Sequence, residues 1–317
     1  MADTPSTPTA PPTGYALQPL AGLTVAEVLQ HYEDLSFPPL ARRLAVKPAA
    51  GAWRGAVALD DRGPVGLALL EAGAAADPGD SEMAQLFSLA VLPGHRRRGL
   101  GGALVAAAER LAQGAGSRAI EGAYRTSWRS RRAIEALLAG RGWSPPEIRM
   151  VLARSETGFA RAYLRAPAPE LPPEAEIFTW EELTAAERER ILERQREDPW
   201  FPAILTPFQE EPRLEPTISV GLRWRGEVAG WLVCHRVAFD TLQYSASFVR
   251  EDLRGRGLGA ALMREGVRRR LADPDIRHAI LAIDARNRRV RALIEGTFRR
   301  YFAGISELRV SRKRLDD

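Results

Sequence analysis

Cysteine, histidine and long apolar runs are scarce in this chain of 317 residues. Its single cysteine, Cys234, excludes an intramolecular disulfide. No apolar run approaches the roughly 18 residues that a membrane-spanning helix needs. The four histidines are scattered, which argues against a metal site. The stretch 1–14 is rich in Pro and Thr and lacks the apolar segment of a signal peptide, so we expect a disordered tail and a cytoplasmic protein.

Lysine is also nearly absent, because only Lys47 and Lys313 are lysines among the 45 basic residues. The formal net charge is +5, a modest surplus that suits an anionic ligand. No stripe of basic residues is interleaved with stacking aromatics, so a nucleic-acid partner is the weakest of the alternatives. The hydrophobic content of 45% and the length indicate a globular chain of two domains.

One sequence pattern occurs twice, from Val91 to Leu104 and, at a constant offset, from Val249 to Leu262. Both copies contain Arg-x-x-Gly-x-Gly, which begins at Arg96 in the first copy and at Arg254 in the second. Each copy follows a strand-like run and opens a helix-like run. A repeat at this separation predicts two similar domains, because a solenoid repeats about every 20–50 residues.

Glycines at a strand-to-helix junction let the backbone approach a ligand closely, and the first N–H groups of the helix attract anions. The pattern therefore predicts a phosphate site, to which the arginines can add charge-assisted hydrogen bonds. A P-loop is excluded because the chain has no Gly-Lys-Ser/Thr. A Rossmann fingerprint fits only the second copy, since Arg97 stands where the first copy would need a glycine.

The two motifs resemble those of the GNAT superfamily of acyl-CoA-dependent N-acyltransferases. The resemblance lies in Val91-x-Pro93-x-x-Arg96-x-x-Gly99-x-Gly101 and in Val249-x-x-x-x-Arg254-x-x-Gly257-x-Gly259, where Glu251 replaces the proline. It implies an α/β (α+β) fold with two tandem domains, each a mixed, mostly antiparallel sheet that is flanked by helices and splayed beside the loop. The tandem arrangement is similar to that of mycothiol synthase, which we take as architecture only.

The expected organisation is a tail at 1–14, an N-terminal GNAT-like domain at 15–164, a Pro-rich linker at 165–176 and a C-terminal GNAT-like domain at 177–317. In each domain a hairpin precedes the strand that enters the motif, and a helix leaves it. Closing strands are expected at 148–153 and 306–311. Thr184 and Glu187 have the spacing of a capping box at a helix start.

In the GNAT family the strand before the motif offers main-chain groups to the thioester and the pantetheine, while the loop and helix bind the pyrophosphate of coenzyme A. By resemblance, the cofactor-binding residues of the first copy are Leu89, Ala90, Val91, Arg96, Arg97, Arg98, Gly99, Leu100, Gly101 and Gly102. Those of the second copy are Ser247, Phe248, Val249, Arg254, Gly255, Arg256, Gly257, Leu258, Gly259 and Ala260, with Asn287 after the next strand.

N-acyl transfer requires a neutral amine, a stabilised oxyanion and a proton for the departing thiolate. The catalytic candidates are Asp284, Asn287 and Tyr301, with Glu82 and Glu121 as alternative bases. Many GNAT enzymes carry a tyrosine as the acid about seven residues after the asparagine position. Here those positions hold Ile134 and Ile294, so Tyr301, Tyr124 or solvent would have to supply the proton.

Two other features can be interpreted either as core packing or as part of a functional site. Strand alternation puts His235 on the face of Trp231 and Val233, where a packed histidine is expected. The aromatic stretch 198–208 borders either an acceptor pocket or the core.

We therefore expect an acetyl-CoA-dependent N-acetyltransferase that moves an acetyl group to a primary amine by direct attack in a ternary complex, without a metal. The acceptor would be a small-molecule amine or a protein N-terminus. The second half is favoured as the catalytic one because it keeps the asparagine, Asn287. The alternative is a catalytically silent protein that binds or senses acyl-CoA.

Overall fold

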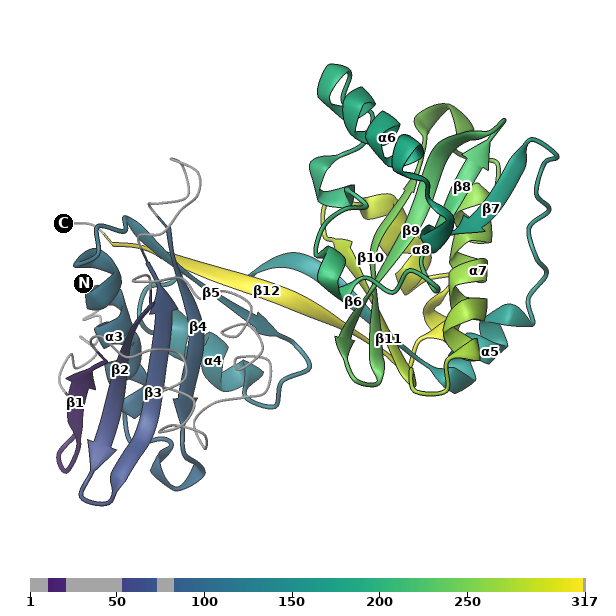
Figure 1. The fold of residues 1–317 in the computed structure, drawn as a ribbon. Coiled ribbons are helices and arrows are strands. Elements are labelled where there is room, and N and C mark those ends of the chain that lie inside the picture. Colours follow the sequence, from purple (N-terminus) through teal and green to yellow (C-terminus); the bar gives the residue numbers. More distant parts are fainter. Residues whose placement is uncertain (1–10, 21–52, 73–82, 316–317) are drawn as a thin grey trace. The chain divides into compact units, whose positions relative to one another are not determined.

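The computed structural model describes residues 11–20, 53–72 and 83–315. The chain divides into two compact units, Met1–Ile148 with Leu308–Asp317, and Arg149–Glu307. Each unit is a mixed sheet with helices, drawn as a ribbon in Figure 1. The expected α/β class with two similar domains is confirmed.

The sheet of the first unit has the order β1-β2-β3-β4-β5-β12. All neighbours are antiparallel except β4 and β5, which are parallel. The strands are β1 (Ala16–Pro19), β2 (Trp53–Asp60), β3 (Gly63–Glu71), β4 (Met83–Val91), β5 (Ala119–Arg125) and β12 (Gly304–Arg314), which belongs to this unit from Leu308 onward. The helices are α3 (Leu100–Gln113) and α4 (Arg131–Ala139).

The second unit repeats this plan with the order β6-β11-β10-β9-β8-β7, in which only β10 and β11 are parallel. The strands are β6 (Glu147–Glu156), β7 (Ala175–Thr179), β8 (Val220–Trp224), β9 (Glu227–Ala238), β10 (Thr241–Val249) and β11 (His278–Asp284). The helices are α5 (Thr157–Leu164), α6 (Ala185–Glu197), α7 (Leu258–Ala272) and α8 (Arg288–Glu295).

The last strand of each half of the sequence pairs in the unit built mainly from the other half. β6 pairs with β11 from Met150↔Asp284 to Glu156↔His278, and β12 pairs with β5 from Leu308↔Arg125 to Arg314↔Ala119. The strands lie where the sequence predicts them, but periodicity alone does not reveal the partner strand. The compact units consequently divide at 148 and 308, whereas the domain limits at 164 and 177 stay a prediction from the sequence repeat.

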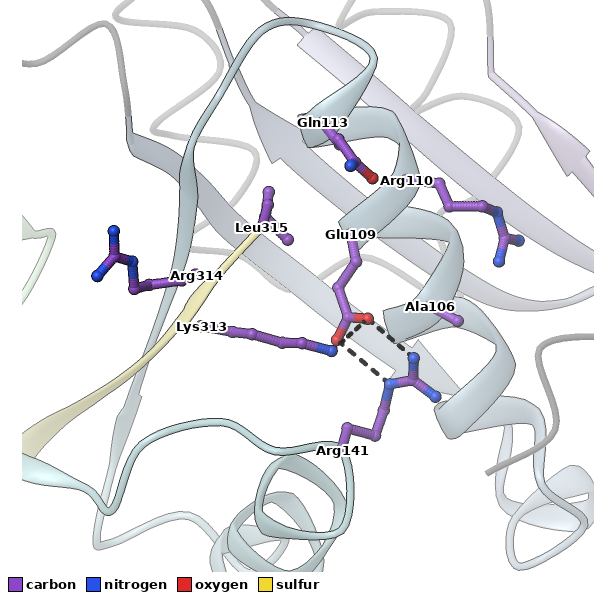
Figure 2. Close-up of a pocket in the computed structure, with 8 residues that line it drawn as sticks. All are labelled: Ala106, Glu109, Arg110, Gln113, Arg141, Lys313, Arg314 and Leu315. Carbon is purple, nitrogen blue, oxygen red and sulfur yellow. Dashed lines mark hydrogen bonds and ion pairs between the residues drawn. The ribbon is translucent and has the colours of Figure 1, made fainter. Parts of the chain in front are cut away.

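Glu109 on α3 anchors β12 in the first unit. Its carboxylate accepts hydrogen bonds from Arg141 and from Lys313 of β12, the latter at 3.0 Å (Figure 2). It also accepts one from the indole of Trp143 at 2.8 Å. Although burial opposes the charge, these donors lower the pKa of Glu109. Further along β12, Arg312 donates to the buried carboxylate of Glu121 at 2.8 Å. Two charged contacts thus reinforce the pairing of β12 with β5.

Around Glu109 lies a pocket of about 340 Å³. Figure 2 shows that it is lined by the C-terminal half of α3 and the end of β12, together with Arg141. The motif begins α3 at its other end. Since the three donors occupy the carboxylate, we interpret this pocket as the surroundings of a structural clamp.

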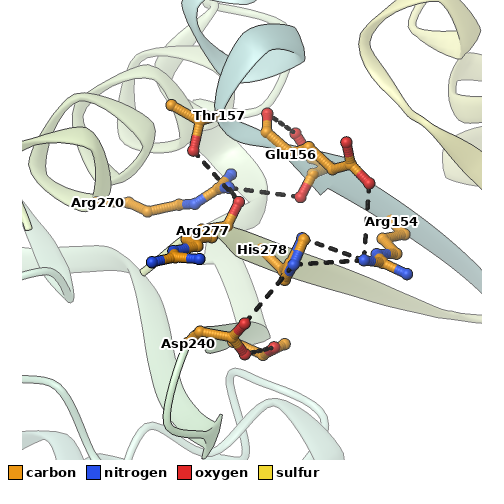
Figure 3. A network of polar contacts seen from close by, with 9 residues as sticks. Arg154, Glu156, Thr157, Asp240, Arg270, Arg277 and His278 are labelled. Carbon is orange, nitrogen blue, oxygen red and sulfur yellow. Dashed lines mark hydrogen bonds and ion pairs between the residues drawn. The ribbon is translucent and has the colours of Figure 1, made fainter. Parts of the chain in front are cut away.

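Polar contacts also hold β6 against β11 in the second unit (Figure 3). Arg154 of β6 lies 3.2 Å from Nδ1 of His278, and Asp240 lies 3.6 Å from Nε2 of the same ring. Arg270 of α7 is fully buried and donates to the main-chain oxygens of Ser155 and Arg277. These bonds connect β6, β11 and α7 at the end where the β10–β11 pairing begins.

The predicted capping box is confirmed at the start of α6. Thr184 accepts from the N–H of Glu187 at 3.2 Å, while the Glu187 carboxylate accepts from the N–H and hydroxyl of Thr184, each at 2.9 Å. Arg223 of β8 donates to the same carboxylate at 2.7 Å. The arginine bond and the cap lower the pKa of Glu187 from 4.5 to about 2.

We expect Glu187→Gln to lower the free energy of unfolding of the second unit by about 2–3 kcal/mol at pH 7, because the variant loses a charged bond and leaves the largely buried Arg223 with only the longer, 3.6 Å contact to Glu176. The folded pKa lies below the unfolded one, so this contribution exists above pH 4.5 and disappears as the pH falls towards 2. Urea unfolding between pH 7 and pH 3 measures it. Glu189→Gln on the same helix removes the exposed pair with Arg196 and should change stability by less than about 0.5 kcal/mol. Equal effects of the two variants would contradict this assignment.

Candidate coenzyme A site

Both copies of the motif fold into the same strand–turn–helix junction, which we call the first loop (92–99) and the second loop (250–257). Each contains a short 3₁₀ turn, Pro93–His95 or Glu251–Leu253, and ends on a glycine that caps the helix. The caps Gly99 and Gly257 have left-handed φ angles of 84° and 78°. An L side chain in this conformation costs about 1–2 kcal/mol, so these two glycines are set by geometry.

A second left-handed residue precedes each cap by two positions. In the second loop it is Gly255 with φ 86°, and in the first loop it is Arg97 with φ 61°. The first loop therefore adopts the same path despite a side chain that disfavours it. Matching backbones with different residues indicate that the loop shape, rather than the side chain, is the common feature.

The motif arginines hold the loops in place. Nε of Arg96 donates to the carbonyl of Val91 at 2.9 Å, and Nε of Arg254 donates to the carbonyl of Val249 at 3.3 Å. Each bond ties the loop to the end of the preceding strand. The sequence assigns these side chains to phosphate. In the structure Arg96 uses its Nε donor for this bond, and Arg254 uses a second donor for Glu251 as well. The remaining donors of the two exposed guanidinium groups are available to a ligand.

Neither helix has a side-chain cap, and neither has an acidic residue in its first turn. The first intrahelical bonds are Ala103 N–H to Gly99 and Ala261 N–H to Gly257. The N–H groups before them lie at the positive end of the helix dipole without an intrahelical acceptor. Such a helix start binds phosphate-type anions.

The two loops differ in charge. The first contains Arg96, Arg97 and Arg98 and no carboxylate. The second also contains three arginines, but Glu251 lies 3.3 Å from Arg254 and Asp252 lies 2.8 Å from Arg250. The first loop is thus the more cationic anion site.

The strand that enters each loop separates from its parallel neighbour. β4 pairs with β5 from Met83↔Ala119 to Leu86↔Gly122, and β10 pairs with β11 from Thr241↔His278 to Tyr244↔Leu281. Directly after these pairs, a bulge at Phe87 or Ser245 shifts the register with β3 or β9. Beyond the bulge, β4 and β10 no longer pair with β5 and β11. This leaves one edge unpaired with the parallel neighbour along Ser88–Val91 and along Ala246–Val249. The predicted main-chain contacts at 89–91 and 247–249 lie on these edges.

Asp284 is held as an anion at the end of β11. Arg286 pairs with it at 2.6 Å and also donates its main-chain N–H at 2.8 Å. These bonds lower the pKa of Asp284 to about 2. A carboxylate with so low a pKa is a weak base, which disfavours the base role predicted for it.

Asn287 and Tyr301 occupy structural positions. Asn287 caps α8, accepting the N–H of Val290 at 3.2 Å. Tyr301 packs edge-to-face on Tyr163, with 5.4 Å between the ring centroids. The structure therefore gives Asn287 a reason to be present that is independent of a ligand, while its predicted contact with coenzyme A stays a prediction.

The other acid and base candidates of the first unit are engaged. Glu121 is 2% exposed and bound to Arg312. Tyr124 donates to Glu135 at 3.1 Å, and its pKa rises to about 12 through burial and the neighbouring carboxylate. Glu82 lies outside the described residues. Ile294, at the family's tyrosine position in the second unit, is buried in an apolar cluster.

The aromatic rings of the stretch 198–208 pack on the core. Trp200 and Phe201 contact Trp231 of β9 and Phe248 of β10 at centroid distances of 5.0–5.9 Å. The core interpretation thus holds for these rings. They cover the face of the sheet opposite to α7. Trp231 and Val233 lie on this face, and alternation along β9 puts His235 there as well.

Family comparison settles the class of the chain. Residues 23–142 and 177–296 each match the model of the Acetyltransferase (GNAT) family. The chain belongs to the GNAT family. This membership supports acyltransferase activity in general. No curated protein matches the chain significantly.

Two solved structures superpose along nearly the whole chain. A tandem GNAT protein from the clavulanic acid biosynthesis pathway, solved without acetyl-CoA, gives a TM-score of 0.65 at 20% identity, over 96% of this chain and 99% of that chain. A GCN5-related N-acetyltransferase from Sphaerobacter thermophilus gives 0.57 at 17% identity, over 97% and 98%. At these identities the likeness establishes the fold alone.

Two absences apply to the part of the chain that the structure describes. None of its helices is long and apolar enough to cross a membrane. No group of three or more His, Cys, Asp or Glu side chains within it could hold a metal ion.

We expect Gly257→Ala to lower the free energy of unfolding of the second unit by about 1–2 kcal/mol, because alanine must adopt the left-handed conformation of the cap. Gly259→Ala, two residues later, lies inside α7, and its Cβ would meet Val249 at an ordinary 3.8 Å. It should leave stability unchanged or raise it slightly, since alanine favours helix. Thermal unfolding by calorimetry compares the two, and a larger loss for Gly259→Ala would refute this cap geometry.

Proposed function

We propose that the chain is an acetyl-CoA-dependent N-acetyltransferase that transfers the acetyl group to a primary amine by direct attack in a ternary complex. The observation that carries the proposal is the paired geometry found in both units. A left-handed glycine cap exposes free helix N–H groups, and the strand before it separates from its neighbour beyond a bulge. Pyrophosphate fits the first feature and an extended thioester arm fits the second.

The residues present are suited to coenzyme A in charge and in space. Arg96, Arg97 and Arg98 of the first loop and Arg254 and Arg256 of the second are exposed near uncapped helix starts. A Cβ at Gly255 would meet no atom within 4 Å, so the space before the second loop is open. When bound, coenzyme A would supply the activated acyl group, and the chain's part would be to hold it and to place the acceptor.

The released strand edges provide the remaining chemistry. Main-chain N–H groups along 88–91 and 246–249 can donate to an oxygen that becomes negative during attack on the carbonyl. The described tyrosines give no clear acid, because Tyr124 donates to Glu135 and isoleucine occupies both family positions. The departing thiolate would then take its proton from solvent.

A second function is favoured by the same departures from the family pattern, namely the isoleucines at the positions of the family's tyrosine. A protein without an acid or a good carboxylate base can bind acyl-CoA as a sensor without turning it over, and the pKa of Asp284, about 2, agrees with this alternative. For the transferase, the acceptor would be a small-molecule amine or a protein N-terminus, chosen by side chains beyond the two loops.

Calorimetric titration with acetyl-CoA tests the proposal. We expect two sites per chain, of which the first loop is the tighter because it lacks carboxylates. Gly101→Val and Gly259→Val should each remove one site, since a branched side chain would fill the space over the helix start. Circular dichroism controls for folding, because valine is a weaker helix former.

Release of free thiol from acetyl-CoA, measured over a panel of primary amines, separates the two functions. Amine-dependent release that a Gly101→Val or Gly259→Val variant loses would support the transferase. Tight binding without release would support the sensor. A wild-type protein that binds no acetyl-CoA would refute both.

A further inference from the structure

A buried histidine meets a serine at the bulge of β10. Nδ1 of His235 lies 2.7 Å from Oγ of Ser245, and Nε2 lies 2.8 Å from the carbonyl of Gln209. His235 is 5% exposed, whereas Ser245 is half-buried. The three groups thus form a chain that runs from the interior to a partly accessible hydroxyl.

The partners fix the tautomer of the ring. The Gln209 carbonyl can only accept, so Nε2 of His235 carries the hydrogen. Nδ1 of the neutral ring is then the acceptor and receives the hydroxyl hydrogen of Ser245. If Nδ1 gains a proton, the Gln209 carbonyl still accepts from Nε2 and stabilises the cation.

Ser245 stands at the point where the sheet opens. The ladder between β10 and β11 ends at Tyr244↔Leu281, and the register with β9 shifts between Tyr244 and Ala246. The packing of the residues on either side of Ser245 shows on which face of the sheet each of them lies. Tyr244 packs on the α7 side and Ala246 on the opposite side with Trp231, which is also the side of His235.

No other charge competes for the pair among its described neighbours. Arg236 holds Glu215, and Arg213 pairs with Glu210 at 2.9 Å. Cys234 points into the other face and is fully buried, which raises the pKa of its thiol.

The first unit has no counterpart. In the second unit His235 lies opposite Gln243, and the equivalent pair in the first unit is Glu71 opposite Gln85. The bulge residue of the first unit is Phe87, where the second unit has Ser245. A serine–histidine pair is therefore particular to the second unit. A purely structural role would not require it to lie at the bulge.

We propose that Ser245 and His235 form the proton relay for the acceptor amine in the second unit. Ser245 is the catalytic residue that meets the amine, and His235 acts through it as a positioning base. This inference rests on the proposed function.

The relay accounts for every proton in the transfer of the acetyl group to the amine. As the amine nitrogen bonds to the thioester carbon, its proton passes to Oγ of Ser245, and the hydroxyl proton passes to Nδ1 of His235. The carbon–sulfur bond breaks, and the thiolate is protonated by solvent. The imidazolium then returns its proton to solvent, which leaves the amide, the free thiol and the starting enzyme.

A cysteine at position 245 allows the relay to be tested although the acceptor amine is unknown, because the reactivity of its thiol shows whether His235 accepts the proton. In Ser245→Cys, His235 should convert the thiol into a thiolate and accelerate alkylation by iodoacetamide about tenfold at pH 7. Ser247→Cys, exposed on the same strand, is the matched control, and buried Cys234 gives the background. The acceleration should vanish in Ser245→Cys/His235→Gln, and acetyl-CoA should slow the reaction.

Equal rates for the two cysteines, or no effect of His235→Gln in a folded protein, would overturn the relay. So would alkylation that acetyl-CoA does not slow although calorimetry shows it bound to the second unit. If calorimetry shows no binding there, the proposed function of that unit fails, and with it the relay.

Ser245→Ala gives a second test, with circular dichroism as the control for folding, because it removes only a hydroxyl but leaves Nδ1 of His235 without its partner. With any amine that supports thiol release by the second unit, kcat should fall about 100-fold with KM for acetyl-CoA unchanged. Unchanged kcat would overturn the proposal.

Discussion

The left-handed cap before α3 and α7 is the constraint on which the site depends. It turns the chain sharply from the end of a strand into a helix, whose first-turn N–H groups have neither an intrahelical acceptor nor a side-chain cap. The arginine bond from Arg96 to Val91, or from Arg254 to Val249, keeps this turn closed. The first loop adopts the turn even with Arg97 in a strained conformation, which shows how strongly the surrounding structure imposes it.

Exchange of the last strands gives each sheet a partner strand from the distant half of the sequence. β12 lies beside β5 and is held by the carboxylates of Glu109 and Glu121. β5 is also the strand from which β4 separates. One edge of the opening in the first unit is therefore supported by residues at the far end of the chain, and the C-terminal strand belongs to the scaffold of that unit's site.

Much of the fold and of the candidate site could be predicted from the sequence. The features that could not be predicted have one cause in common. The loops, the helices that leave them and the capping box of Thr184 and Glu187 are local patterns, and they appear where expected. The exchange of β6 and β12 is a choice between equivalent sheet edges, which side-chain periodicity does not encode. The contact of His235 with Ser245 depends on a bulge that adds one residue to β10, and alternation breaks at that residue. The weak basicity of Asp284 follows from Arg286, two residues away, whose bidentate contact depends on the turn after β11.

The two units share a backbone plan but have diverged in complementary ways. The first loop contains three arginines and no carboxylate, while Glu251 and Asp252 reduce the charge of the second. The bulge of the second unit carries a serine bonded to a histidine, while that of the first carries Phe87. In the proposed function, phosphate binding would depend on the loop and proton transfer on the bulge. The more cationic loop and the serine–histidine pair lie in different units. Under that proposal, affinity for coenzyme A and catalytic competence need not reside together, and the tighter of two binding sites would be a poor guide to the catalytic one.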